Sequence, residues 1–208
     1  YPSASAKART TFFGKKNIEL VSTKNLVDEC WGSERPARPE NKIHHLTDEY
    51  TGEKTADKVE RIVKKLDSAA DFLLVTTLDD IAWTLNCRGN DIEYNPVFFS
   101  YLLLNGSTKS LTLYVNETKT TDVADYRKSL NVAVLPYEKV EEELAKLVGD
   151  GKKIATDTNE ANAEICRIIG DSAVDKSSLI EGIKAEKNAV EQKGMRDCHV
   201  RDMAALIR

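Results

Sequence analysis

Short apolar runs of strand length alternate with segments of helical period over residues 56–169, and this alternation restricts the chain to few folds. In residues 56–66 the apolar side chains recur three or four positions apart, so they share one face of a helix. Residues 71–76 form an apolar run that is typical of a strand buried on both faces. Strands that alternate with helices predict an α/β domain, in which helices cover a central sheet.

A hairpin makes that sheet mixed. Residues 98–104 and 111–115 read as strands, and the Asn-Gly-Ser-Thr-Lys segment between them has the length and composition of a hairpin loop. Further helices are predicted at residues 78–86, 122–129, 137–148 and 159–169, and further strands at 132–135 and 153–156. Five strands interleaved with helices therefore predict a three-layer α/β domain with a mixed sheet.

The two ends of the chain differ from this central part. Residues 17–21 have the composition of a short strand and residues 23–31 that of a short helix, but together they are too few to bury a core. Residues 32–54 carry almost no periodic apolar signal and predict an extended connector. Residues 188–208 predict a long helix with a ragged apolar face and no closing glycine, so we expect further chain on both sides.

Composition excludes some classes of function. The formal net charge of −4 argues against binding to nucleic acid or to a membrane surface, because neither would be attracted electrostatically. No apolar run approaches the roughly 20 residues that a bilayer span requires. The four cysteines are widely scattered and form no closely spaced pair, which argues against a zinc ribbon and favours a reducing, cytoplasmic compartment.

A polar turn between two buried runs is the most unusual local feature. The stretch LNCRGNDIEYNPVFFSYLLL, residues 85–104, places Arg88 and Asp91 around a glycine that permits a tight turn. The guanidinium of Arg88 offers five donors in a planar fork that can hold a carboxylate. In the simplest interpretation Arg88 pairs with Asp91 or Glu93 and fixes its own loop.

Other polar groups are weaker candidates. His44 and His45 are adjacent in an extended segment, so they point to opposite sides and predict a solvated loop rather than a metal site. His199 and Asp202 lie three apart on the expected last helix, but two ligands make a poor site, and an ion-pair network is the simpler interpretation. Trp83, at helical spacing, is expected in the core.

Three segments together resemble the aminopeptidase P family of metallopeptidases. They are NLVDECWGSERPARP at residues 25–39, LDDIAWTLNCRGNDIEYNPVFFSYLLL at residues 78–104 and KNAVEQKGMRDCHVRD at residues 187–202. They stand in the family's order, and the resemblance covers the chain from about Ile18 onward. Cys87 departs from the family, in which leucine is common at that place, and residues 203–208 match only loosely.

The resemblance implies a three-domain Xaa-Pro aminopeptidase and a central domain of the creatinase/prolidase N-terminal type. Residues 1–52 would be the tail of the first domain and a connector, residues 53–186 the central α/β domain, and residues 187–208 the first helix of the catalytic domain. That last domain has the pita-bread fold and binds two divalent metals, usually manganese. It removes an N-terminal residue that precedes proline.

The family's metal ligands would lie beyond residue 208, so this chain is expected to bind no metal and to be inactive alone. The resemblance suggests that its polar loop faces the catalytic domain and lines the active-site entrance, with Arg88, Asp91, Tyr94 and Asn95 orienting a short peptide. Its partners would be its own catalytic domain and a second subunit in a homodimer. The rival interpretation is an inactive pita-bread-related protein that binds a partner, as histone-chaperone subunits of this architecture do.

Overall fold

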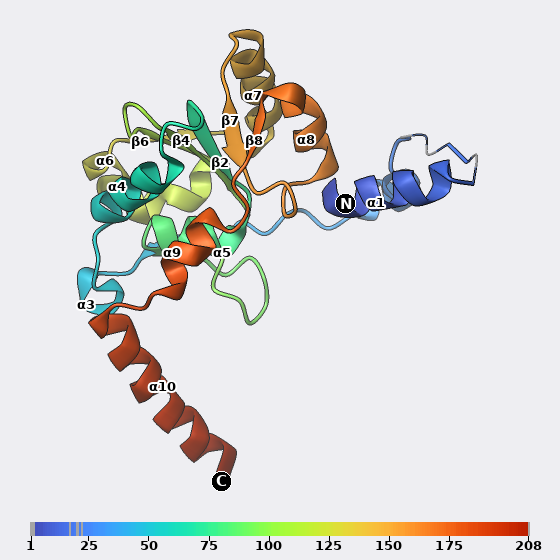
Figure 1. Cartoon of the computed structure of the whole chain (residues 1–208). Helices are drawn as coiled ribbons and strands as arrows, with labels where there is room; N and C mark the ends of the chain where they lie inside the picture. The colour runs from blue at the N-terminus through green and yellow to red at the C-terminus, as the bar shows by residue number, and fades with distance from the viewer. Residues whose placement is uncertain (1–2, 17, 20, 22, 208) are drawn as a thin grey trace.

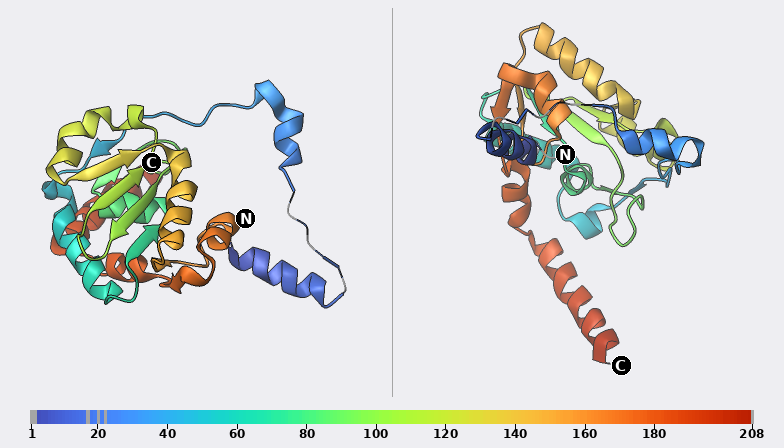
Figure 2. Two further views of the ribbon diagram at one scale, coloured as in Figure 1. Left: turned by 90° about the horizontal axis from the view of Figure 1, so that it is seen from above. Right: turned by 90° about the vertical axis from the view of Figure 1, so that its right-hand side faces the viewer.

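The computed structural model describes residues 3–16, 18–19, 21 and 23–207. Its centre is a six-stranded sheet with helices on both faces, as Figures 1 and 2 show. The strands lie in the order β6-β5-β4-β2-β7-β8. Their bounds are β2 (Phe72–Val75), β4 (Tyr101–Asn105), β5 (Leu111–Tyr114), β6 (Val132–Leu135), β7 (Ile154–Thr156) and β8 (Ala173–Asp175).

The sheet is mixed because β4 alone runs against the other five strands. It pairs antiparallel with β2 on one side and β5 on the other, whereas the pairs β5–β6, β2–β7 and β7–β8 are parallel. The loop between β4 and β5 is closed by Asn105, whose Oδ1 accepts from the backbone nitrogens of Ser107 and Thr108, both at 2.9 Å. The predicted hairpin and the mixed sheet are confirmed.

Side chains that alternate along the strands pack into two separate hydrophobic cores, one on each face of the sheet. On one face Leu73 and Val75 of β2 pack beneath α4 (Thr55–Leu66), α5 (Leu78–Thr84) and α9 (Leu179–Ala185). On the other face Leu74 packs beneath α7 (Val140–Gly149) and α8 (Ala163–Ile169). Because neighbouring residues of a strand point to opposite faces, an unbroken apolar run is needed to serve both cores. The predicted three-layer α/β architecture is confirmed.

Two helices, α8 and α2 (Leu26–Trp31), begin later than the sequence predicts, directly after a residue whose side chain caps the helix. Asn162 Oδ1 accepts from Ile165 N at 2.9 Å, so α8 begins at Ala163 rather than near residue 159. Asn25 Oδ1 accepts from Val27 N at 3.2 Å and starts α2 in the same way. The segment 117–129 divides into η2 (Glu117–Val123) and α6 (Ala124–Ser129), and the segment 137–149 into η3 (Tyr137–Lys139) and α7.

The expectation of five strands was wrong. β8, which follows η4 (Gly170–Ser172), is a sixth strand of the main sheet, and β1 (His44–His45) pairs antiparallel with β3 (Cys87–Arg88) in a second, two-stranded sheet. The connector is also less uniform than predicted, because it includes η1 (Gly32–Glu34), β1 and α3 (Asp48–Thr51). Ile18, Glu19 and Val21 form no strand, and the rest of the strand expected at residues 17–21 lies outside the described residues.

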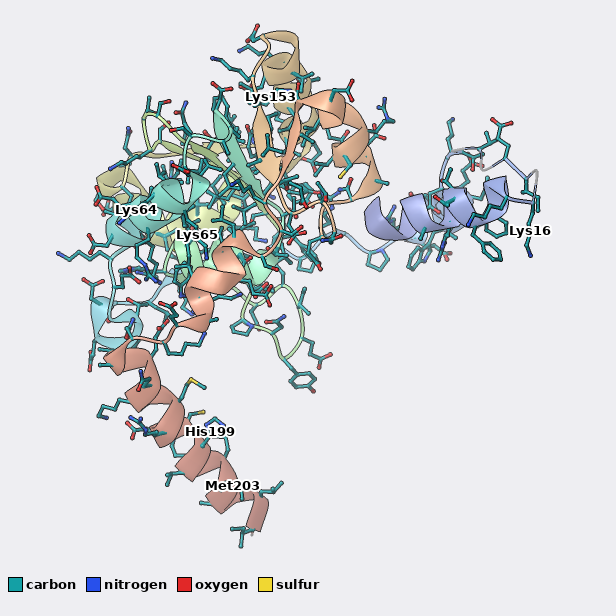
Figure 3. All side chains as sticks on the ribbon, viewed as in Figure 1. Lys16, Lys64, Lys65, Lys153, His199 and Met203 are labelled. Carbon is teal, nitrogen blue, oxygen red and sulfur yellow. The ribbon has the colours of Figure 1, made fainter. Side chains whose placement is uncertain are left out.

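Two long helices lie outside the three layers. α1 (Ser3–Gly14) touches the domain at α8, whereas α10 (Ala189–Ile207) leaves it beside α3 (Figure 1). Figure 3 shows His199 and Met203 projecting from α10 with no other element of the described chain beside them. In the described part of the chain, no helix combines the length and the apolar character that crossing a membrane requires.

Candidate functional site

The polar turn predicted from sequence is a protruding loop, residues 89–99, that leaves β3 and returns to β4. In Figure 1 it extends below α5, on the side of the domain from which α10 leaves. Its two arms are tied by Gly89 N, which donates to Pro96 O at 3.3 Å, and by Asp91 N, which donates to Val97 O at 3.1 Å. A Cβ at Gly89 would lie 2.7 Å from Phe98 Cβ, so the close approach of the arms requires glycine.

Tyr94 and Asn95 lie at the exposed tip of the loop. Asn95 N donates to Ile92 O at 3.1 Å and closes a tight turn, in which Tyr94 has a φ of +62°. A bulky residue in the left-handed region carries a conformational cost of about 1–2 kcal/mol. The Tyr94 side chain is nevertheless 96% exposed, so no packing of that side chain within the described chain offsets the cost.

Asp91 lies at the base of the loop and points inward. Its Oδ2 accepts from the ammonium of Lys119, which η2 supplies, and from Phe99 N at 2.7 Å. The exposed fractions of the two side chains are 0% for Asp91 and 2% for Lys119. The other carboxylate oxygen, Oδ1, is buried and has no hydrogen-bond partner in the described part of the chain. The position of Asp91 is therefore that of an anchor that holds the loop in one shape.

Arg88 also lies at the base, half-buried beneath α5. Its Nη1 donates to Ala82 O and Cys87 O, both at 2.9 Å. Burial lowers the pKa of its guanidinium, and the nearby carboxylate of Glu191 opposes that shift. The pairing of Arg88 with Asp91 or Glu93 that the sequence left open is not formed, because Asp91 binds Lys119 instead. Among the described residues, the Nε and Nη2 donors of Arg88 have no hydrogen-bond partner.

A buried lysine lies behind Arg88 and was not anticipated from the sequence. Lys58 of α4 is 1% exposed, and its Nζ donates to Trp83 O at 2.9 Å and to Asn86 Oδ1 at 2.6 Å. The same ammonium lies 4.2 Å from the centre of the Trp83 ring, a cation–π contact. Trp83 is 7% exposed, which confirms its predicted place in the core. A lysine at helical spacing gives no sign of burial in sequence, because such residues are almost never buried.

We expect Lys58 to make the unfolding free energy depend on pH above neutrality. Burial lowers the pKa of Lys58 from 10.5 to about 8, whereas the unfolded chain keeps the higher value. Between pH 8 and pH 10.5 the native state therefore binds fewer protons than the unfolded state, so native stability rises with pH, by up to about 3 kcal/mol from this group. Urea unfolding of wild type and Lys58→Met at pH 7.5, 9 and 10 measures it. Parallel pH curves for the two proteins would contradict the assignment.

The three histidines have different surroundings. His45 pairs with Cys87 in the two-stranded sheet and stacks on Tyr126 with ring centroids 3.6 Å apart, so the predicted solvated loop was wrong for this residue. His44 is exposed on the opposite side, as expected for adjacent residues of a strand. His199 contacts Met195 O at 2.7 Å, within its own helix. Across the residues that the structure describes, no three His, Cys, Asp or Glu side chains are placed to hold a metal ion.

Residues 34–191, about three quarters of the chain, match the family model of the Creatinase/Prolidase N-terminal domain. The chain belongs to this family. Over 98% of its length it is 35% identical to a probable Xaa-Pro aminopeptidase P of Coprinopsis cinerea, and over 90% it is 42% identical to one of Podospora anserina. These matches cover 35% and 29% of the relatives. The resemblance to aminopeptidase P is confirmed.

Solved structures agree with this assignment. The X-prolyl aminopeptidase of Caenorhabditis elegans, described as a cytosolic enzyme with a di-nuclear active site, superimposes with a TM-score of 0.88 at 31% identity. The match covers 98% of this creatinase/prolidase N-terminal chain and 34% of the nematode enzyme. The Xaa-Pro dipeptidase of Bacillus anthracis shares the fold, with a TM-score of 0.54 at 13% identity. The chain thus spans about a third of the Xaa-Pro aminopeptidases that it matches, at the position of their N-terminal region.

Proposed function

We propose that this chain is the non-catalytic N-terminal portion of a metal-dependent Xaa-Pro aminopeptidase, and that loop 89–99 forms one wall of the entrance to its active site. The other wall would be the catalytic domain that follows α10. The observation that carries this proposal is the loop itself, which projects on the side from which α10 leaves the domain (Figure 1) and is held at its base by the buried pair of Asp91 and Lys119. In this arrangement the chain narrows the entrance and orients peptides that have proline in second position.

The strained backbone at Tyr94 supports a contact between the loop tip and a group outside this chain. Tyr94 combines a positive φ with a side chain that is 96% exposed, and the buried pair of Asp91 and Lys119 holds the base in place. Backbone strain of this kind persists where the surroundings enforce it, and it clusters at binding sites. An aromatic ring at the tip of a fixed loop offers a flat, amphipathic surface to a peptide or to the facing domain.

Two groups of the loop could bind a short peptide. Tyr94 and Asn95 would meet it at the tip, and the Nε and Nη2 donors of Arg88 suit a carboxylate, such as the C-terminus of a small substrate. The residues of this chain do not fit the two-metal centre of the family, since no three candidate ligands converge in its described part. We therefore assign the two metals, of which manganese is the expected identity, to the catalytic domain. The cytosolic nematode relative supports a cytoplasmic location.

The proposal that catalysis requires the domain after α10 is tested by comparing this chain with the full-length protein. With added manganese, only the full-length protein is expected to release the first residue of an Xaa-Pro peptide. Activity in the 208-residue chain would contradict the non-catalytic assignment. Inactivity of both proteins would overturn the peptidase proposal and favour the partner-binding rival.

In the full-length enzyme, Tyr94→Ala is expected to lower kcat/KM for an Xaa-Pro tripeptide about tenfold, equivalent to about 1.4 kcal/mol of lost binding in the transition state. Arg88→Ala should also raise KM or lower kcat, because it removes both the free donors and the support of the loop. Steady-state kinetics with metal content checked by elemental analysis measures these effects. Tyr50→Ala is the matched control, since Tyr50 is a 65% exposed aromatic outside the loop. If Tyr94→Ala and Tyr50→Ala have the same kcat/KM, the loop does not line the entrance to the active site.

A further inference from the structure

The N-terminus of α10 is closed by a reciprocal cap. Asn188 Oδ1 accepts from Val190 N and Glu191 N, both at 2.9 Å, while Glu191 Oε2 accepts from Asn188 N at 2.9 Å. This is a capping box, in which the residue before the helix and the third helical residue satisfy each other's backbone N–H groups. The box fixes the first turn of α10 before any other domain contributes.

The same cap is attached to α3. Asn188 Nδ2 donates to Thr51 O at 2.8 Å, and Gly52 follows with a φ of +66°. A Cβ at Gly52 would lie 2.5 Å from Asn188 Oδ1 and 2.8 Å from Val190 Cβ. Glycine is therefore required here twice, for the left-handed backbone and for the close approach of α10.

Glu191 makes a second attachment, to α5. Its Oε1 accepts from Trp83 Nε1 at 3.3 Å, so its two carboxylate oxygens serve two different donors. The Trp83 ring is held in place by the ammonium of Lys58 on its face. The residue before Trp83 is Ala82, whose carbonyl holds Arg88 at the base of loop 89–99. One short helix, α5, thus contacts both the base of the loop, through Ala82, and the first turn of α10, through Trp83.

We propose that Glu191 is a positioning residue that fixes the direction of α10 relative to loop 89–99 through Trp83. The inference rests on the proposed function, because α10 would lead into the domain that forms the opposite wall of the entrance. A capping role alone would be filled by glutamine, which also closes a capping box. Positioning requires two acceptors on one side chain, and glutamine has only one acceptor oxygen.

The contact is tested first in the 208-residue chain. The sequence contains two tryptophans, so Trp31→Phe leaves Trp83 as the single indole. In that background Glu191→Gln is expected to shift the indole N–H resonance of Trp83 and to speed its hydrogen exchange at least tenfold. Glu142→Gln is the matched control, an exposed glutamate in the first turn of α7 that pairs with Lys139. An unchanged resonance in Glu191→Gln would overturn the proposal.

A double-mutant cycle in the full-length enzyme tests the consequence. Glu191→Gln and Trp83→Phe are each expected to lower kcat/KM about tenfold for peptides long enough to reach the loop, and less for a dipeptide, with metal content unchanged. Because both remove the same contact, the double variant should be no worse than the single ones. Independent, additive losses, or equal losses for long and short peptides, would overturn the positioning role.

The two proposals can fail separately. If the Trp83 resonance shifts and the cycle shows coupling while Tyr94→Ala leaves the kinetics unchanged, Glu191 positions α10 but the loop does not line the entrance. If the resonance does not respond, the positioning role is wrong, whatever the result for Tyr94.

Discussion

Lys119→Met is expected to destabilise the chain by about 3–5 kcal/mol, because it leaves the Asp91 carboxylate buried without its counter-charge. Both side chains are almost fully buried, and one oxygen of Asp91 already lacks a hydrogen-bond partner within the described structure. Removing the only cation that faces this carboxylate in the described structure therefore exposes the full penalty of a buried, unpaired charge. Chemical denaturation at pH 7, compared with wild type, measures the loss.

The control for Lys119 is a lysine with an exposed partner. Lys109 pairs with Glu60 at 2.7 Å, and the two side chains are 47% and 65% exposed. Lys109→Met should change stability by less than about 1 kcal/mol, since solvent screens such pairs. Combining Lys119→Met with Asp91→Leu should recover much of the loss, because the buried charge is then removed. If Lys119→Met is as mild as Lys109→Met, Asp91 and Lys119 do not form a buried pair.

Gly52→Ala is expected to weaken the attachment of α10 by about 2–4 kcal/mol. About 1–2 kcal/mol comes from the left-handed backbone, and the remainder from a Cβ that would overlap Asn188 Oδ1 at 2.5 Å. The effect should be local, so amide hydrogen exchange in residues 188–192 should accelerate at least 30-fold while the sheet keeps its protection.

Gly151 provides the matched comparison for Gly52. Its φ is +74°, and nothing lies within 4 Å of a Cβ built on it. Gly151→Ala therefore isolates the backbone cost, and we expect about 1–2 kcal/mol and no change in exchange at α10. Equal behaviour of α10 in the two variants would show that α3 and α10 do not approach as closely as the structure indicates.

The main architecture could be predicted from sequence because its signals are local. The apolar run of β2 and the spacing of α4 each specify their element within a dozen residues. The strands that were missed, β1, β3 and β8, are two or three residues long, and their assignment depends on a distant pairing partner rather than on a pattern. The polar turn within residues 85–104 predicted a loop at this place in the chain, and the structure has an exposed loop there.

Two supports of the candidate site could not be predicted, since they join residues far apart in the chain. Lys119 stands 28 residues after Asp91 in a polar segment that predicts no element, and Glu191 lies 108 residues after Trp83. Sequence spacing shows neither that Lys119 is buried nor which carboxylate it meets. The peptide-orienting role of Arg88 and Asp91 stays a prediction, but their place at the base of the loop, where Asp91 binds Lys119 and Arg88 binds Ala82 O, could not be predicted.

The pairing of Asp91 with Lys119 also sets the order in which parts of the domain fold during synthesis. The loop leaves the ribosome before the β4–β5 hairpin and before η2, which supplies the counter-charge. Domains fold as the chain emerges, at about 5–20 residues per second, so Asp91 stays solvated until the hairpin has formed and brought Lys119 beneath it. The loop thus acquires its final shape only after half of the sheet is in place, and a nascent chain stalled before residue 119 presents it as a flexible acidic segment.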